Sequence, residues 1–286
     1  MSGDGPPRQG TANPTPEIGK SIRAAGVLTN YHEAGTGAPV VLLHGSGPGV
    51  SAWGGWRLAI PALAERLHVF AYDQVGFGQT ELPEAAEYSL DLWVQHLIAF
   101  MEGVGLKRAH IVGNSMGAAV AIAAAVQCPD LVDRLVLMGA VGVSFALTEG
   151  LDATWGYEPS IANMKRLIGL FAYDRKLVTD ELAELRYQAS IRPGAQKSFS
   201  RMFPSPRQRS IDALARYETR LSDIRSPTLV IHGREDQVVP LANAYKLLSE
   251  IPNAQLHVFG HCGHWTQIEH ATAFNRLVCD FLTEDA

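Results

Sequence analysis

Cysteine is scarce in this sequence, and its scarcity argues against two ways of stabilising a fold. The 286 residues contain three cysteines, Cys128, Cys262 and Cys279, and no two of them form a C-x-x-C pair. An odd and sparse count argues against a disulfide framework and against a zinc ribbon. We therefore expect a protein of the reducing cytoplasm.

Long apolar runs and an excess of positive charge are also missing. No run of about 18 apolar residues free of charges occurs, so a membrane span is not expected. Lys and Arg number 24 against 29 Asp and Glu, which gives a net charge of −5 and no basic footprint for nucleic acid. Hydrophobic residues nevertheless make up 47% of the chain, which is enough for a full core and excludes wholesale disorder.

Short apolar runs recur along the chain, and most are followed by Gly, Asp or Asn. Runs of four or five residues without polar alternation are typical of strands buried on both faces of a sheet. Because helix-like stretches separate them, the pattern predicts an α/β protein with a mostly parallel central sheet flanked by helices. The predicted strands are residues 40–43, 68–72, 110–113, 135–138, 228–231 and 256–259, and the clearest helices are residues 90–102, 116–127, 241–250 and 272–282.

Two parts of the chain break this alternation. Residues 1–22 are rich in Pro, Gly and polar residues and lack the apolar stretch of a secretory signal, so we expect a disordered tail. Residues 143–208 are helix-like without a convincing strand, which predicts an all-helical lid inserted into a core of residues 23–142 and 209–286. Because ligands of open α/β sheets bind beyond the carboxyl ends of the strands, reactive residues are expected directly after strands.

The segment 113–117 (GNSMG) matches the pattern G-x-S-x-G. It follows a predicted strand directly and precedes a predicted helix directly. A strained strand-to-helix turn of this kind needs small residues on both sides and projects the serine hydroxyl out of the sheet. We predict Ser115 as a nucleophile, and the N–H of Met116, at the helix N-terminus, as a donor to an oxyanion.

A serine nucleophile needs a base, and the base needs an orienting acid. His264 comes just after the last predicted strand and Asp236 just after the strand before it, with His261 and Glu235 as their nearest rivals. The order Ser115, Asp236, His264 is that of α/β-hydrolases and differs from the orders in chymotrypsin and subtilisin. We therefore predict that these three residues form a catalytic triad.

A glycine-rich turn, residues 44–49 (HGSGPG), follows the first predicted strand of the core. It can bring a second backbone N–H, that of Ser46, to the same oxyanion. It is not a phosphate loop, because the pattern G-x-x-x-x-G-K-[ST] and a nearby lysine are both missing. The dinucleotide-binding pattern fails as well, because the glycine spacing is wrong.

Together these segments resemble the α/β-hydrolase superfamily and, more narrowly, the meta-cleavage product hydrolases, which break a carbon–carbon bond during bacterial aromatic degradation. The chain looks closest to the branch that acts on alkylbenzene- or toluene-type ring-fission products. The SGPG turn, the Asn before the nucleophile and the Trp after the base are much more specific than G-x-S-x-G alone. The matching segments are residues 44–53 (HGSGPGVSAW), 113–117 (GNSMG), 189–194 (ASIRPG), 232–240 (HGREDQVVP) and 257–270 (HVFGHCGHWTQIEH).

The resemblance implies cleavage of 2-hydroxy-6-oxo-hexa-2,4-dienoates between C5 and C6, giving 2-hydroxypenta-2,4-dienoate and a carboxylic acid, with no metal and no organic cofactor. It implies that Arg192 binds the substrate carboxylate and that Gly45, Asn114 and Trp265 contact the substrate. It also implies a homo-oligomer, a dimer or larger. The chain departs from the family at Gly55, where an Asn is common, and the pocket therefore lacks one polar side chain.

Other functions fit part of the same pattern. A carboxylesterase or acyl transferase of this fold would carry the same triad, and only the SGPG turn, Asn114, Arg192 and Trp265 favour carbon–carbon cleavage. Dehalogenases and epoxide hydrolases, which carry Asp at the elbow, are excluded by Ser115. A ligand receptor built on an inactive hydrolase is the remaining alternative, and the complete triad argues against it.

Overall fold

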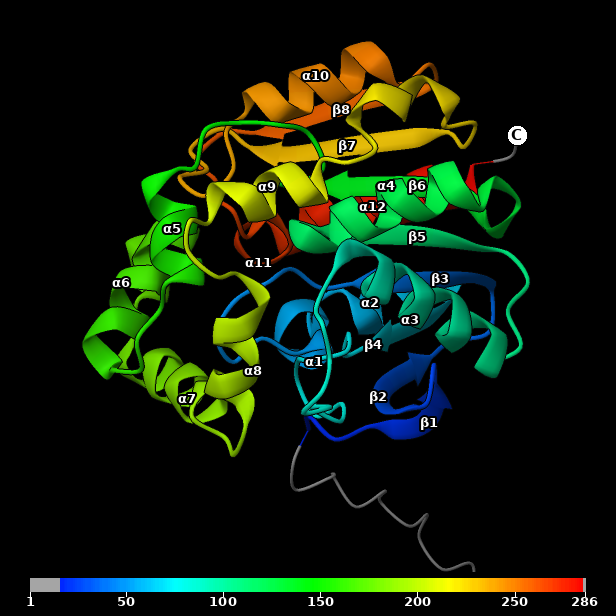
Figure 1. Cartoon of the computed structure of the whole chain (residues 1–286). Helices are drawn as coiled ribbons and strands as arrows, with labels where there is room; N and C mark the ends of the chain where they lie inside the picture. The colour runs from blue at the N-terminus through cyan, green and yellow to red at the C-terminus, as the bar shows by residue number, and fades with distance from the viewer. Residues whose placement is uncertain (1–15, 285–286) are drawn as a thin grey trace, which may run out of the picture.

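A single twisted sheet organises the chain in the computed structural model, which describes residues 16–284 (Figure 1). The eight strands lie in the order β1-β2-β4-β3-β5-β6-β7-β8, and neighbours from β4 to β8 run parallel. The predicted α/β class and all six predicted strands are confirmed. The strands are β1 (Lys20–Ala24), β2 (Val27–Ala34), β3 (Ala38–Leu43), β4 (Leu67–Tyr72), β5 (Ala109–Asn114), β6 (Val132–Met138), β7 (Thr228–Gly233) and β8 (Ala254–Phe259).

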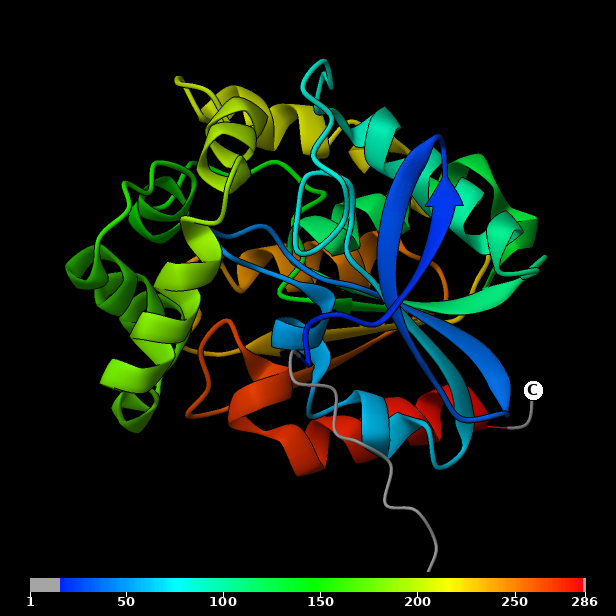
Figure 2. The same cartoon turned by 90° about the horizontal axis from the view of Figure 1, so that it is seen from below.

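Both faces of the sheet are buried, because side chains alternate between two layers of helices. In β3, Val41 and Leu43 pack into one apolar cluster and Val40 and Leu42 into the other. This explains why the central strands have continuous apolar runs. The first face is covered by α3 (Leu90–Gly103), α4 (Met116–Gln127) and α10 (Ala242–Glu250), and the second by α1 (Ala52–Trp56), α2 (Ile60–Leu63) and α12 (Ala271–Thr283) (Figure 2).

The central helix α4 is apolar all round and buried from Met116 to Val126. A helix with this pattern belongs in the interior of the protein, so its N-terminus is held firmly at the end of β5. Within residues 16–284, no helix is both long and apolar enough to cross a membrane.

The N-terminal hairpin corrects the predicted boundary of the tail. Residues 1–15 lie outside the described part of the chain, but β1 begins at Lys20, inside the segment expected to be disordered, and pairs antiparallel with β2. Four of the five residues of β1 are at least partly exposed and two of those are charged, as expected of an edge strand. Sequence analysis missed β1 and β2 because they lack the continuous apolar run of a central strand.

The segment between β6 and β7 contains helices joined by turns and loops, and none of its residues forms a strand. Its first four α-helices form a layer beyond the carboxyl ends of the strands, coloured green to yellow-green in Figure 1. We keep the name helical lid for residues 143–208. The four lid helices are α5 (Glu149–Trp155), α6 (Ile161–Phe171), α7 (Asp180–Ser190) and α8 (Ala195–Met202), with η2 (Arg175–Leu177) between α6 and α7. The chain returns to β7 through α9 (Gln208–Leu214) and η3 (Glu218–Asp223). Outside this segment lie the short helices η1 (Pro129–Leu131), before β6, and α11 (Thr266–Glu269), before α12.

Candidate active site

The turn between β5 and α4 holds Ser115 in a strained backbone conformation. Its φ is 55° and its ψ is −116°, values that a residue with a side chain rarely adopts. The two glycines of the motif have no room for a side chain. A Cβ at Gly113 would lie 2.5 Å from the Gly117 carbonyl oxygen, and a Cβ at Gly117 would lie 2.5 Å from the Leu43 carbonyl oxygen. This is the geometry of the predicted nucleophile elbow.

His264 and Asp236 form a buried pair. His264 Nδ1 lies 2.7 Å from Asp236 Oδ2, and their side chains are 4% and 1% exposed. The other oxygen of Asp236, Oδ1, accepts the backbone N–H groups of Val238 and Val239 at 2.7 and 2.9 Å. Burial alone would raise the pKa of Asp236, but the neighbouring imidazoles of His264 and His232 and the amide of Val239 outweigh it and lower the pKa. The acid therefore stays ionised beside the imidazole.

The two rivals considered for these roles point elsewhere. His261 is exposed, and its Nδ1 lies 3.1 Å from the hydroxyl of Tyr173. Glu235 accepts the backbone N–H of Cys262 at 3.0 Å and pairs with Arg234. The structure therefore pairs His264 with Asp236, whereas the rivals hold other parts of the loop.

Gly139 lies between the serine turn and the histidine–aspartate pair, and sequence analysis did not single it out. The N–H of Ser115 donates to the carbonyl of Met138 at 2.9 Å, directly before Gly139. A Cβ at Gly139 would lie 3.0 Å from His264 Cε1 and Nδ1 and 3.5 Å from Asp236 Oδ2. No hydrogen bond joins the Ser115 hydroxyl to His264 among residues 16–284; in enzymes without substrate this contact is often long and tightens in the complex.

The glycine-rich turn after β3 lies against the elbow. A Cβ at Gly45 would lie 2.9 Å from Asn114 Oδ1 and 3.0 Å from Ser115 Cβ. The backbone N–H groups of Ser46 and Met116 donate to no other residue in the described part of the chain. The hydroxyl of Ser46 accepts the indole N–H of Trp155, in the helical lid, at 2.9 Å. Two backbone donors are thus available near the nucleophile, as an oxyanion hole requires.

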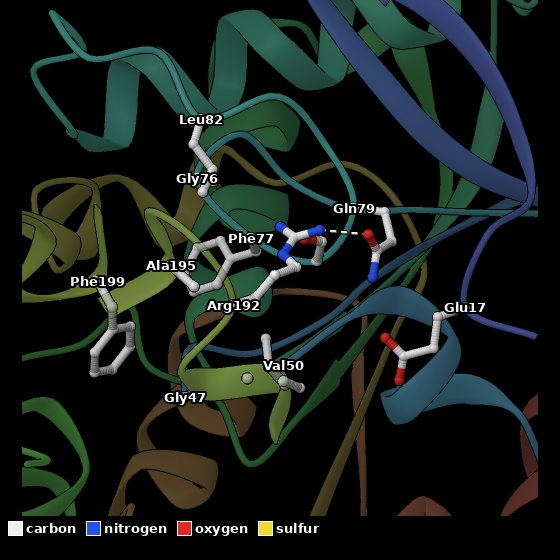
Figure 3. A pocket seen from close by; sticks show the side chains of 13 residues that line it. Glu17, Gly47, Val50, Gly76, Phe77, Gln79, Leu82, Arg192, Ala195 and Phe199 are labelled. Atoms are coloured by element: carbon white, nitrogen blue, oxygen red, sulfur yellow. Dashed lines mark hydrogen bonds between the residues drawn. The ribbon is translucent and has the colours of Figure 1, made fainter. Parts of the chain in front are cut away.

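A narrow cleft runs from this turn toward the helical lid, and Arg192 lies in its centre (Figure 3). The guanidinium of Arg192 donates to Gln79 Oε1 and to the carbonyl of Gly78. The carboxylate of Glu17 lines the cleft on the opposite side (Figure 3). Arg192 therefore lines this cleft, and its Nη1 and Nη2 donate to the loop after β4.

A second arginine of the lid, Arg186 in α7, lies against Trp265, the residue after the predicted base. Its guanidinium carbon is 5.1 Å from the centre of the Trp265 ring, and its Nη2 lies 3.4 Å from the carbonyl oxygen of Pro48 in the glycine-rich turn. Its Nε is enclosed and has no partner among the described residues. Burial lowers the pKa of Arg186 to about 10, so it stays charged at neutral pH.

The helix pattern contains a signal for Arg186 that sequence analysis missed. Ala183 and Ser190 are the buried residues of α7. Arg186 lies three residues after the first and four before the second, so it falls on the same inward face. Arg186 is therefore a second candidate, beside Arg192, for binding an anion.

Trp265 and Asn114 complete the predicted set. Trp265 is 8% exposed and stacks on Phe171 of the helical lid with ring centres 5.0 Å apart. The side-chain amide of Asn114 donates to the Met138 carbonyl at 3.3 Å, and its oxygen faces Gly45. Both side chains therefore lie beside members of the predicted triad. Among residues 16–284, no three His, Cys, Asp or Glu side chains come together as candidate metal ligands.

Comparison with known proteins adds independent findings. The model of the α/β-hydrolase fold family matches residues 38–271. The chain is 56% identical to a 2-hydroxymuconate semialdehyde hydrolase from Pseudomonas sp. (strain CF600), over 94% of this chain and 95% of that protein. It is 54% identical to a 2-hydroxy-6-oxo-2,4-heptadienoate hydrolase from Pseudomonas putida (strain F1), over 96% of this chain and 99% of that protein.

Solved structures agree with these relatives. A meta-cleavage product hydrolase from Pseudomonas fluorescens, a serine-to-alanine variant complexed with acetates, superposes with a TM-score of 0.92. It is 61% identical to this chain and covers 93% of it and 97% of its own length. The similarity therefore extends over most of the chain, with the sheet, the loops of the predicted triad and the helical lid together.

Proposed function

The chain belongs to the meta-cleavage product hydrolases of the α/β-hydrolase superfamily, and on that premise we propose that it hydrolyses the C5–C6 bond of 2-hydroxy-6-oxo-hexa-2,4-dienoates. The products are 2-hydroxypenta-2,4-dienoate and a carboxylic acid. The observation that carries this proposal is the buried His264–Asp236 pair, joined through the residues around Gly139 to the strained elbow of Ser115. An arginine of the helical lid faces the same loops.

Substrate binding begins with the carboxylate. We assign its anchor to Arg186, because a fixed guanidinium beside an aromatic face recognises a planar carboxylate well. Arg192, the anchor implied by the family resemblance, donates to Gln79 and Gly78 and is the second candidate. Trp265 and Asn114 would flank the dienoate. Gly55 leaves room near His44, where a Cβ would lie 3.7 Å from His44 Cβ.

The reaction then proceeds in two stages. The dienol first becomes its keto tautomer, with a proton added at C5, so that C5 can later leave as a stabilised dienolate. Ser115 Oγ attacks the C6 carbonyl while its proton passes to His264, and the N–H groups of Met116 and Ser46 stabilise the oxyanion. Asp236 orients the imidazole and stabilises its charged form.

Collapse of this intermediate breaks the C5–C6 bond. The bonding electrons move into the dienolate, which takes up a proton as 2-hydroxypenta-2,4-dienoate, and the acyl group stays on Ser115. Water, deprotonated by His264, then attacks the acyl carbon and releases the carboxylic acid. The atoms balance with one water consumed for each bond broken.

Absorbance measurements test the function directly. Ring-fission products with hydrogen, methyl, ethyl, isopropyl or phenyl at C6 should lose their yellow colour on addition of the enzyme. Ser115→Ala should bind these compounds and lower kcat by several orders of magnitude. A carboxylesterase with the same triad is the alternative function, and it would cleave p-nitrophenyl esters faster than any dienoate. That result would reject carbon–carbon cleavage as the main activity.

We further propose that the enzyme works in the cytoplasm as a homo-oligomer, a dimer or larger, that takes a small carboxylate as substrate and binds neither nucleic acid nor membrane. The cysteines support the compartment, because Cys128, Cys262 and Cys279 are all free thiols in the structure. Light scattering coupled to size-exclusion chromatography measures the oligomeric state, and a mass of one chain would reject the homo-oligomer.

A further inference from the structure

We infer that Glu269 is a positioning residue that fixes the catalytic histidine loop to the helical lid. Glu269 is the last residue of α11, five positions after His264. Its role was predicted by no sequence motif, and it touches none of the three triad side chains in the structure. The inference rests on the proposed role of His264 as the base.

The carboxylate of Glu269 bridges two segments that are far apart in the sequence. Its Oε1 accepts the N–H of Gly263, directly before His264, at 2.7 Å. Its Oε2 accepts the N–H groups of Tyr173 and Asp174, just after α6 of the lid, at 2.7 and 2.9 Å. One side chain thus satisfies three backbone donors, two from the lid and one from the histidine loop.

The same two segments also contact each other directly. The N–H of His264 donates to the carbonyl of Phe171 at 2.7 Å, and the Phe171 ring stacks on the imidazole with centres 5.8 Å apart. A Cβ at Gly263 would lie 2.4 Å from that same carbonyl oxygen. The backbone of the predicted base is therefore held by the lid, and Glu269 secures the lid in that position.

The Cys262 thiol, in the same histidine loop, also donates to Oε1 of Glu269 at 3.9 Å, so the further contact of this carboxylate ties the same loop. No Lys, Arg or His pairs with Glu269 among residues 16–284. Hydrogen bonds from backbone N–H groups to a carboxylate are about twice as strong as neutral ones. Removing the carboxylate would leave three donors without their acceptor and release the loop that carries His264.

Three variants test the inference: Glu269→Ala, Glu269→Gln and the matched control Glu218→Ala. Glu218 is also a carboxylate that accepts an N–H from the lid, that of Ser144 at 3.1 Å, but it lies away from the histidine loop. We expect Glu269→Ala to lower kcat for dienoates by about tenfold with a smaller change in KM, because small displacements of reacting groups have effects of this order. Glu269→Gln keeps one acceptor oxygen and should fall between wild type and Glu269→Ala.

A second measurement does not depend on the substrate. The rate at which a small fluorophosphonate labels Ser115 should fall in Glu269→Ala by the same factor as kcat, whereas Glu218→Ala should label and turn over within about twofold of wild type. Equal rates for Glu269→Ala and wild type, or an equal loss in Glu218→Ala, would overturn the inference. If Glu269→Ala does not fold, the labelling rate of Glu269→Gln decides. If wild type bleaches no dienoate, the proposed function fails, and the labelling rates still decide the role of Glu269.

Discussion

Replacing Gly139 by Ala tests whether the packing around the proposed triad is as tight as the structure indicates. Gly139 has a φ of +50°, and its position brings an added Cβ within 3.0 Å of two atoms of the His264 ring. The ring cannot stay where it is, because contacts this short are rare and a neighbour must move by a few tenths of an ångström. The hydrogen bond to Asp236, now 2.7 Å, lies on the side that would be disturbed.

Two effects of this substitution have different sizes. The positive φ costs about 1 kcal/mol once the residue carries a Cβ. Displacement of the imidazole affects the reaction instead, and since a shift of about 1 Å in reacting groups can cost 10²-fold in rate, a few tenths of an ångström should cost about tenfold. The first effect appears in the free energy of unfolding and the second in kcat.

A glycine elsewhere separates the two effects. Gly105 has a φ of +80°, and a Cβ there would meet nothing within 4 Å. Gly105→Ala should therefore lose stability much as Gly139→Ala does, while keeping the kcat of wild type. Urea unfolding and dienoate bleaching measure the two quantities. The reasoning fails if Gly139→Ala and Gly105→Ala show the same kcat.

Three further predictions concern charge. Asp236→Asn should lower kcat by about 10³- to 10⁴-fold without changing substrate affinity, as measured by bleaching and by equilibrium binding, and a loss below tenfold would contradict its role. Arg186→Gln should raise KM for dienoates by about 100-fold and leave p-nitrophenyl ester cleavage nearly unchanged. Arg192→Gln should change KM for dienoates only a few-fold. A larger rise in KM for Arg192→Gln than for Arg186→Gln would restore Arg192 as the carboxylate anchor. Burial lowers the pKa of His44 and of His96 to about 4, from about 6.5 in the unfolded chain. Between these two pH values the unfolded state binds more protons than the folded state. The free energy of unfolding therefore falls as the pH is lowered from about 6.5 toward 4. The loss between pH 7 and pH 5 is about 2 kcal/mol for each histidine, and urea unfolding of His96→Gln should show a smaller loss than wild type; an equal loss would contradict the assignment.

The parallel core was readable from the sequence because its strands are buried on both faces. Val40–Leu43 and its counterparts are continuous apolar runs, and their ends carry Gly, Asp or Asn at the edge where ligands bind. The proposed reactive residues follow the same logic, since Ser115 comes directly after β5 and Asp236 and His264 lie in the loops that follow β7 and β8. In this part of the chain the local sequence pattern and the observed fold agree.

What the sequence did not reveal depends on neighbours far along the chain. β1 pairs only with β2 at the sheet edge, so its polar residues resemble a loop. Gly139 matters because of the ring of His264, and Arg186 matters because α7 turns that residue inward. The spacing of Ala183, Arg186 and Ser190 is present in the sequence, but only the placed helix shows that this face of α7 is the buried one.

The position of His264 has a consequence for how the protein is made. It follows β8, the last in chain order of the strands described in residues 16–284, and β8 joins the sheet by pairing with β7. Parallel strands form slowly because their contacts are distant in sequence. Ser115 is therefore synthesised well before His264, the base proposed for it, and the two come together only once β8 has joined the sheet.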